Sequence, residues 1–379
     1  MREYIKLCDV CDFQGGSQPP KDEWSFDFKA GYVRMLQIRD FTQSERVAPE
    51  YIKITKTTRI CEADDILIAR YGASLGKILT GLAGAYNVAI MRTIPDTNIL
   101  EKKYLYYYLK SPVFQGFLLN VGSRAAQAGF NKNDLQDLFI PNITRNEQVE
   151  IVRILERVET VIEARQKELQ KLDDLIKARF IEMFGDININ NKNWHTEHLG
   201  KLCNIVRGSS PRPIEKYLGG DIPWIKIGDA TDEDNIYLNS TKEHIIREGV
   251  NKSRFVKKGS LIFANCGVSL GFARIISFDG CIHDGWLALE NIDYRLNKEF
   301  LLLSLNQLTD HFRIIAPSGT QPNLNIAIMQ NFMQVIPPME LQETFVSFRR
   351  HVDKSREEVK RSLEKTQQLY DSLMQEYFG

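Results

Sequence analysis

The sequence predicts an α/β protein made of two tandem repeats, in which each repeat is an α/β domain followed by a long helix. Three observations indicate this fold. Strand-like and helix-like segments recur in the same order in both halves of the 379-residue chain. Each half ends in a long segment, 147–185 or 341–379, that lacks proline and has no glycine before its last residue. Apolar residues in these two segments follow the spacing of a coiled coil.

The first part of each repeat contains short β-branched segments separated by Gly, Pro and Asn turns, a pattern typical of α/β domains. Each repeat starts with Lys-Leu-Cys, followed by a glycine and proline turn, a strand-like segment that reaches an aspartate, and a turn that ends in Ser-Leu-Gly. The matched segments are 6–10 and 201–205, 15–19 and 208–211, 33–40 and 222–229, and 65–76 and 260–271. So many matches in one order exclude chance similarity.

The second part of the repeat continues the correspondence. The matched segments are 104–109 and 300–305, 127–131 and 321–325, 140–141 and 336–337, and 182–185 and 376–379. Near the start of each long helix a glutamine is kept, Gln148 or Gln342, but Leu341 stands where the first copy has Glu147. We expect this difference to alter slightly how the second helix enters the helix pair.

These correspondences predict four structural parts, and each α/β domain is large enough to bury a core of its own. The parts are a first α/β domain at 1–142, a long helix at 143–185, a second α/β domain at 186–338 and a second long helix at 339–379.

Each long helix carries one apolar stripe with spacings that alternate between three and four residues. In the first helix the stripe is interrupted at Arg165 and Arg179. A helix as long as 147–185 would extend about 60 Å, too far to bury its stripe within one small domain. We expect the two helices to pair as an antiparallel coiled coil; the alternative is that each folds back on its neighbouring domain. The predicted interface residues are Ile151, Leu155, Val158, Ile162, Leu169, Leu172, Ile176, Phe345, Phe348, Val352, Val359, Leu369 and Leu373.

Composition and charge give no sign of a membrane protein. Hydrophobic residues make up 43% of the chain, and no stretch approaches the roughly 18 consecutive apolar residues of a membrane span. The N-terminus lacks the apolar segment of a signal peptide, so we expect a cytoplasmic location and no membrane partner. Lys plus Arg equals Asp plus Glu at 49 each. This balance argues against nonspecific DNA binding, but not against a reader that places a few cations locally.

The six cysteines are predicted to be reduced thiols, as expected in a long cytoplasmic chain. Cys8 and Cys11 have the spacing of half a zinc site, but no second pair follows at a useful distance. His195, His198 and Cys203 form an incomplete set. We therefore expect no metal site.

Near-matches to catalytic motifs fail in their details. Residues 72–78 resemble a phosphate-binding loop, but no Ser or Thr follows the lysine, and the matched turn has no lysine. The carboxylates at 96 and 101 lie too close in sequence for a metal-dependent nuclease site, and the second copy does not repeat them. The tyrosines of 104–108 correspond to Phe and Leu in the copy, which indicates a buried helix. The sequence thus predicts no catalytic residues.

Three motifs carry a resemblance to a known family. The turn that ends in Ser-Leu-Gly, the Ile-Pro to Glu-Gln entry at 140–148 and the helix end at 179–185 occur in a characteristic order. Their duplication covers essentially the whole chain. In this order and duplication the sequence resembles the specificity subunits of Type I restriction-modification systems.

The resemblance implies a non-catalytic, DNA-binding subunit. Each α/β domain would be a target-recognition domain that reads one half of an asymmetric, bipartite site in double-stranded DNA, with a fixed nonspecific spacer between the halves. The paired helices would set the spacer and dock two methyltransferase subunits, which ATP-dependent restriction subunits would join. S-adenosylmethionine, ATP and Mg are expected in those partners, and no cofactor is expected in this chain.

Side chains that read bases are expected where the two copies differ, because positions shared by both copies serve the common fold. Arg, Lys, Asn and Gln are the residues that best match base edges. The candidates flank the shared turns: Arg39, Arg70, Tyr71, Arg124 and Gln127 in the first copy, and Arg212, Lys226, Asn265 and Gln321 in the second.

Three other interpretations stay open on the sequence alone. A scaffold could use the coiled coil to bridge proteins without DNA specificity, which would explain the neutral charge but not the two large α/β modules. A self-sufficient restriction or modification enzyme would transfer methyl groups in isolation. A specificity protein of a related system that cuts on both sides of its site would have the same sequence features.

Overall fold

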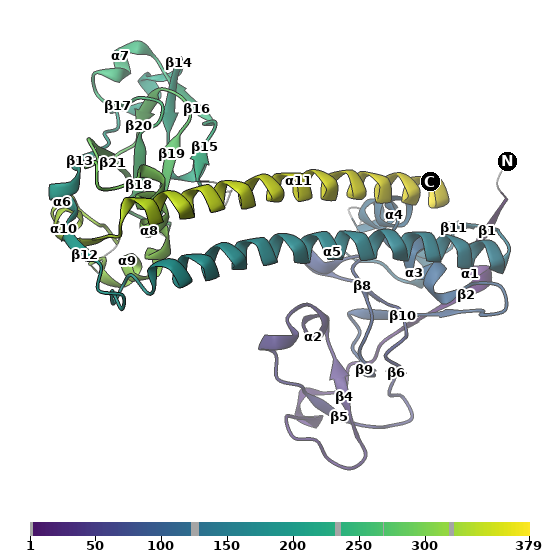
Figure 1. Ribbon diagram of the computed structural model, residues 1–379. Helices are drawn as coiled ribbons and strands as arrows, with labels where there is room; N and C mark the ends of the chain where they lie inside the picture. Colours follow the sequence, from purple (N-terminus) through teal and green to yellow (C-terminus); the bar gives the residue numbers. More distant parts are fainter. Residues whose placement is uncertain (1–2, 123–128, 232–235, 268, 318–321) are drawn as a thin grey trace. The chain divides into compact units, whose positions relative to one another are not determined.

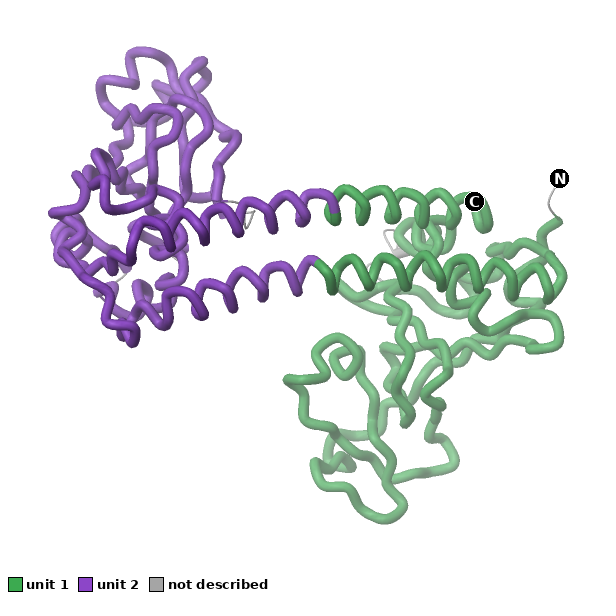
Figure 2. Tube along the Cα trace, viewed as in Figure 1, with its two compact units in different colours: residues 1–168, 359–379 green, residues 169–358 purple. Residues whose placement is uncertain are grey.

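The computed structural model describes residues 3–122, 129–231, 236–267, 269–317 and 322–379. The chain forms two compact units, and the boundary between them crosses both long helices (Figure 2). Unit 1 contains residues 1–168 and 359–379, and unit 2 contains residues 169–358. In the described part of the chain, no helix is both long and apolar enough to cross a bilayer.

The α/β domain of the first repeat consists of short strands and helices (Figure 1). Its strands are β1 (Tyr4–Lys6), β2 (Cys11–Gly15), β3 (Trp24–Ser25), β4 (Tyr32–Leu36), β5 (Tyr51–Lys53), β6 (Ile60–Cys61), β7 (Leu67–Ala69), β8 (Ile78–Leu79), β9 (Gly84–Tyr86), β10 (Ile90–Pro95) and β11 (Phe139–Pro141). Its helices are α1 (Leu7–Val10), α2 (Ile38–Thr42), α3 (Lys102–Lys110) and α4 (Pro112–Gly122). One sheet has the order β2-β10-β7-β8, another has the order β3-β5-β4-β9-β6, and β1 pairs with β11.

The second repeat has a similar order of elements, with β15 and α7 in addition. Its strands are β12 (His195–His198), β13 (Asn204–Arg207), β14 (Leu218–Ile225), β15 (Tyr237–Leu238), β16 (Glu243–Ile245), β17 (Arg254–Val256), β18 (Leu261–Ala264), β19 (Ala273–Ile276), β20 (Gly280–Ile282), β21 (Trp286–Glu290) and β22 (Met333–Ile336). Its helices are α6 (Leu199–Leu202), α7 (Arg247–Val250), α8 (Lys298–Gln307), α9 (Thr309–Ile315) and α10 (Ile326–Asn331).

The sheets of the second repeat have the orders β13-β21-β18-β19-β15 and β16-β14-β20-β17, and β12 pairs with β22. The parallel pair β14 and β20 reproduces the parallel pair β4 and β9 of the first repeat. The predicted duplication of an α/β domain is therefore confirmed.

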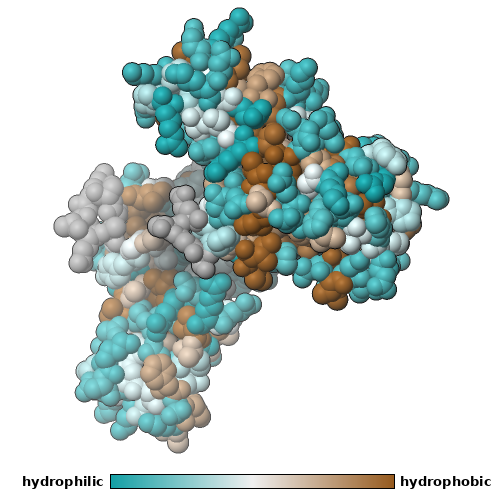
Figure 3. Space-filling view, turned by 90° about the vertical axis from the view of Figure 1, so that its left-hand side faces the viewer, coloured by the Kyte–Doolittle hydropathy of each residue, from teal (hydrophilic) through white to brown (hydrophobic). Residues whose placement is uncertain are grey.

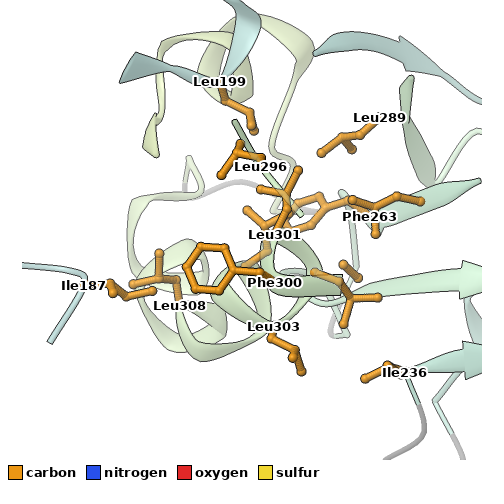
Figure 4. Close-up of a cluster of buried hydrophobic side chains, with 14 of the residues drawn as sticks. Ile187, Leu199, Ile236, Phe263, Leu289, Leu296, Phe300, Leu301, Leu303 and Leu308 are labelled. Carbon is orange, nitrogen blue, oxygen red and sulfur yellow. The ribbon is translucent and has the colours of Figure 1, made fainter. Parts of the chain in front are cut away.

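Strand β18 separates two cores in the second domain, because alternate residues of a strand face opposite sides of the sheet. Leu261 and Phe263 pack with Phe300 of α8 in one core, part of which is drawn in Figure 4. Ile262 and Ala264 pack with Trp286 in the other core. The strand is thus buried on both faces, which explains its continuous apolar sequence.

The long helices α5 (Arg145–Phe184) and α11 (Met339–Phe378) pair with each other in antiparallel orientation. In unit 1, the late α11 residue Tyr370 bonds to the early α5 residue Glu159. In unit 2, the early α11 residue Phe345 packs edge-on against the late α5 residue Phe180, with ring centroids 5.3 Å apart. The predicted antiparallel coiled coil is confirmed.

Each long helix ends in the core of the other repeat. Phe184, at the end of α5, packs against Phe300 of α8 with ring centroids 4.8 Å apart. Phe378, at the end of α11, packs against Tyr104 of α3 at 5.1 Å. Tyr104 and Phe300 occupy matched positions. The phenylalanine of the repeated Phe-Gly ending therefore packs against the same site of the α/β domain in both repeats.

The glutamine kept near the start of each long helix is buried, and its side-chain amide joins three backbone groups, an arrangement we call the brace. Gln148 accepts a hydrogen bond from the backbone N–H of Glu101 (2.7 Å) and donates to the carbonyls of Ile99 (2.9 Å) and Ile143 (3.0 Å). Gln342 accepts from Asn297 N–H (2.8 Å) and donates to the carbonyls of Arg295 (2.9 Å) and Pro337 (2.7 Å). The replacement of Glu147 by Leu341 leaves this brace unchanged, so the expected difference in helix entry is not seen there.

The predicted interface residues are buried to different degrees. Leu155, Ile176, Phe345, Val352 and Val359 are buried. A second set is partly buried: Ile151, Val158, Ile162, Leu169, Leu172, Phe348 and Leu373. Leu369 is 51% exposed, so its assignment to the helix contact is wrong. The heptad that continues from Thr366 brings Tyr370 to the facing side instead, and Tyr370 makes the contact with Glu159.

Candidate nucleic-acid interface

Three loops meet at one edge of each α/β domain, which we call the turn edge. In the first domain it consists of residues 15–17, 70–72 and 87–89, and in the second of residues 208–210, 265–267 and 283–285. Backbone hydrogen bonds join the loops at matched positions: Arg70 N–H donates to Ala89 C=O (2.8 Å), and Asn265 N–H donates to Gly285 C=O (3.0 Å). The turn edge is therefore a feature of the repeat, built by the shared glycine turns.

A glycine in each turn edge permits close backbone contact. A Cβ atom on Gly16 would lie 2.1 Å from the carbonyl oxygen of Asn87, and one on Gly208 would lie 2.1 Å from that of His283. No side chain fits at such distances. This explains why the glycine turn follows the first sheet strand in both repeats.

Arg70 supports the turn edge of the first domain. Its guanidinium donates to the carbonyl oxygens of Phe130 (3.0 Å) and Val88 (3.2 Å). Tyr71 is 39% exposed, and its ring lies against Gly129, where a Cβ would meet the ring at 2.4 Å. Arg70 thus fixes the loops, while Tyr71 offers part of its aromatic surface to solvent.

The prediction that Asn265 contacts DNA is wrong for this structure. Its side chain is fully buried, and its amide nitrogen donates to the side-chain oxygen of Asn323 (3.1 Å). The backbone carbonyl of Asn265 accepts a hydrogen bond from the backbone N–H of Leu324 (2.7 Å). Asn265 therefore holds the segment around Leu324 in place, the same duty that Arg70 performs at the matched position.

Arg212 lies two residues after the turn edge of the second domain, and its side chain is 82% exposed. Its guanidinium lies 3.5 Å from Asp284, a loose ion pair.

Gly285 N–H donates to His283 Nδ1 (2.9 Å), so the proton is on Nε2, which lies 2.9 Å from Asp284. Burial lowers the pKa of His283 below its ordinary value; Asp284 opposes this effect, and Lys226, Arg212 and Arg207 reinforce it. The ring is thus neutral near pH 7.

Arg39 and Lys226 lie beside the other sheet of each domain. Arg39 pairs with Glu50, which also accepts a hydrogen bond from Gln37 (2.7 Å). Lys226, at the position that matches Gln37, pairs with Glu243. Both cations therefore remain near the surface with one carboxylate partner, and binding of a phosphate or base would exchange that partner for another acceptor.

The candidates Arg124, Gln127 and Gln321 lie outside the described residues. The candidates did not include Arg207, an exposed arginine that immediately precedes the turn edge of the second domain and donates to the carbonyl of Asp284 (3.0 Å). Its counterpart in the first repeat is Gly15, because Arg207 pairs with Leu287 as Gly15 pairs with Met91. The difference between Gly15 and Arg207, each followed by the shared glycine at 16 or 208, was the signal in the sequence that identifies this position.

The motifs that resemble catalytic sites have structural roles. Residues Gly72–Ser74 form a short 3₁₀ turn between β7 and β8, and Tyr104, Tyr107 and Tyr108 of α3 are buried, as predicted. Among the described residues, no three His, Cys, Asp or Glu side chains are placed to hold a metal ion. The turn edges therefore remain the main candidates for a functional surface.

Sequence comparison identifies the family. Residues 2–174 and 191–366 match the family described as Type I restriction modification DNA specificity domain. The chain belongs to this family. It is a specificity subunit of the Type I restriction-modification kind, the non-catalytic component of such a system.

Related specificity subunits and solved structures agree with this assignment. The MjaIX specificity subunit of a Type I restriction enzyme from Methanocaldococcus jannaschii is 22% identical over 377 residues, which cover 90% of this chain and 84% of the relative. A chain from a structural study of assembly and conformational transition of the type I R-M system has 17% identity and a TM-score of 0.69, with 99% of this chain and 97% of that chain covered. The S subunit of a Type I system from M. genitalium has 17% identity and a TM-score of 0.55, with 100% and 96% covered. The two structures show that this specificity subunit shares their fold.

Proposed function

We propose that this specificity subunit reads an asymmetric, bipartite site in double-stranded DNA, one half-site with each α/β domain. The observation that carries the proposal is the repeated turn edge with different side chains at matched positions. The pairs at or next to the turn edge are Tyr71 with Cys266 and Gly15 with Arg207, and beside the other sheet Arg39 matches Gly228. Two readers with one backbone plan and different side chains recognise different bases.

The target-recognition domains comprise 1–142 and 186–338, and the helices comprise 143–185 and 339–379. Arg212 is the strongest contact candidate because its side chain is exposed and only loosely paired. Arg39, Lys226 and Tyr71 are further candidates at or near the surface. Arg124, Gln127 and Gln321 are candidates from the sequence. Arg70 is assigned to support of the loops.

The paired helices dock two methyltransferase subunits, and restriction subunits join that complex. A second apolar surface on the unit 1 part of α5 supports this part of the proposal: Ile154 and Val161 are 37% and 44% exposed and lie seven residues apart. Such a surface fits a partner helix. Figure 3 shows one face of the molecule, on which hydrophobic residues lie between polar ones. S-adenosylmethionine, ATP and Mg belong to these partners, and the complex acts in the cytoplasm.

Genome-wide mapping of N6-methyladenine tests the proposal. The host supplies the cognate methyltransferase subunit, with or without this chain. We expect methylation at one asymmetric, gapped motif only when the chain is present. Unchanged methylation, or methylation at a short continuous motif, contradicts the proposal and favours the protein scaffold. A methyltransferase assay on the isolated chain is the control, and we expect no methyl transfer.

A further inference from the structure

The two α/β domains differ at the outer side of one sheet. In the second domain, β15 runs parallel to β19, with Tyr237 beside Ile275 and Leu238 beside Ile276 (Figure 1). Ile275 N–H donates to the carbonyl of Ile236 (2.8 Å). In the first domain β8 is the counterpart of β19, and among the described strands it lies at the edge of its sheet.

Strand pairing identifies the matched residues. Leu79 of β8 pairs with Leu67, as Arg274 of β19 pairs with Ile262, so Thr80 corresponds to Ile275. Ala69 N–H donates to Lys77 C=O (2.9 Å). Because backbone groups alternate in direction along an antiparallel strand, the N–H groups of Ile78 and Thr80 point away from β7. Within the described residues, neither N–H has a hydrogen-bond partner.

A groove follows this open strand. One cavity of about 740 Å³ is lined by Ile66, Thr80, Tyr106 and Tyr107, among others. A second cavity of about 450 Å³ is lined by Phe41, Thr80 and Tyr106 with neighbouring residues. Thr80 and Tyr106 line both cavities, so the two cavities adjoin each other along β8, and we call the pair the edge groove.

The charges around the edge groove are largely neutralised. Asp64 pairs with Lys102 (2.8 Å) and Glu159 with Lys110 (2.8 Å). Lys103 pairs with Glu156. The groove therefore favours backbone pairing and apolar side chains over a strongly charged ligand.

The second domain shows what fits this position. There Tyr237 of β15 donates its hydroxyl hydrogen to Glu299 (2.8 Å), and Glu299 pairs with Arg350. Glu299 and Arg350 match Lys103 and Glu156 with the charges exchanged. The wall of the groove is thus conserved as an ion pair in both domains, while the strand that covers it is present in one.

We propose that an extended segment of a partner subunit adds to β8 as a parallel strand and fills the edge groove. The segment is uncharged where it lies over Tyr106 and carries an aromatic or aliphatic side chain there, as Tyr237 and Leu238 do in β15. Addition of a strand satisfies the backbone groups of an open sheet edge, and the pockets select alternate side chains. The inference rests on the proposed docking of partner subunits and names one contact within it.

Hydrogen–deuterium exchange of the full chain, alone and with the cognate methyltransferase subunits, tests the proposal. We expect exchange in peptides that span 76–82 to slow by roughly tenfold or more in the complex. Peptides that span 271–277 are the internal control, because Ile275 is already bonded to Ile236. If the subunits bind but exchange at 76–82 is unchanged, the edge-groove proposal is overturned and the docking proposal stands. If the subunits do not bind, both are overturned.

A pair of variants provides a second measurement. Thr80→Pro removes the outward N–H group, and Thr80→Val retains it with a side chain of similar size. We expect Thr80→Pro to weaken binding of the methyltransferase subunits by about tenfold and Thr80→Val to bind normally, with equal thermal midpoints for the two free chains. Equal binding by both variants would overturn the proposal.

Discussion

The hydroxyl of Tyr370 donates a hydrogen bond to Glu159 at 3.0 Å, across 211 residues of sequence. Glu159 also accepts from Tyr107 (2.7 Å) and Lys110 (2.8 Å), so one carboxylate on α5 joins α11 and α3. Burial raises the pKa of Glu159, but the hydrogen bonds from Lys110 and Tyr107 outweigh it and bring the pKa below its ordinary value. The carboxylate thus fixes the longitudinal position of the two helices in unit 1.

Glu159→Ala should lower the free energy of unfolding of unit 1 by about 2 kcal/mol, because the substitution removes the shared acceptor of three donors. Urea unfolding followed by circular dichroism measures the change. Glu163→Ala, an exposed glutamate one turn further along α5, is the control and should have little effect. Equal midpoints for both variants would contradict the role of Glu159.

Gln148→Leu and Gln342→Leu should each destabilise the unit in which the brace lies, by about 3 kcal/mol, because buried backbone groups lose their partners. Limited proteolysis distinguishes the two variants. Gln148→Leu should expose sites in unit 1 first, and Gln342→Leu sites in unit 2. The same cleavage pattern for both would show that the glutamines do not act locally.

Gly208→Ala should destabilise the second domain by about 2 kcal/mol, because its new methyl group would meet the carbonyl oxygen of His283. Recognition by that domain should weaken, while recognition by the first domain is retained. Gly228→Ala is the matched control, since a Cβ there meets open space. Methylation of DNA with one altered half-site separates the two effects. Loss at both half-sites would argue against independent readers.

The lowered pKa of His283 makes stability depend on pH. Below about pH 6.5 the unfolded chain binds a proton at this ring and the folded chain does not. The free energy of unfolding therefore decreases as the pH falls from 6.5 toward the pKa of His283 in the folded chain. The thermal midpoint of the chain should therefore fall between pH 7.5 and 5.5, and less so in His283→Gln. His351→Gln, on the exposed side of α11, should behave like the unaltered chain. An identical decrease in all three would remove His283 as the cause.

Arg212→Ala should weaken DNA binding and reduce the dependence of log K on log salt by about one unit if the side chain contacts a phosphate. Lys167→Ala, an exposed cation on α5 outside the α/β domains, is the control for general charge loss. Binding titrations over a range of salt concentrations give both slopes. Equal slopes for the two variants would exclude Arg212 from the interface.

The duplication, the helix pair and the buried α3 tyrosines could be predicted because each depends on a pattern written twice. The contacts of individual side chains could not be predicted from the sequence. Asn265 and Arg70 are polar residues beside a shared turn, and only the folded backbone shows that both point inward to hold loops. Leu369 fitted a local apolar spacing, whereas Tyr370 fits the heptad set by the partner helix. Strand β15 has no counterpart in the first repeat, so sequence matching alone left the edge groove undetected.

The exchange of helix ends has a consequence for the history of the chain. A single ancestral repeat would carry an aromatic residue on its α/β domain, at the position of Tyr104 and Phe300. It would also carry the phenylalanine that packs against this residue, at the position of Phe184 and Phe378. We call each such aromatic contact a joint. Two identical molecules could close on each other through two such joints. Fusion into one polypeptide keeps the two halves, and with them the two joints, together in every molecule. Because these joints and the contacts between α5 and α11 hold the two halves together, side chains elsewhere can differ between the halves without loss of closure.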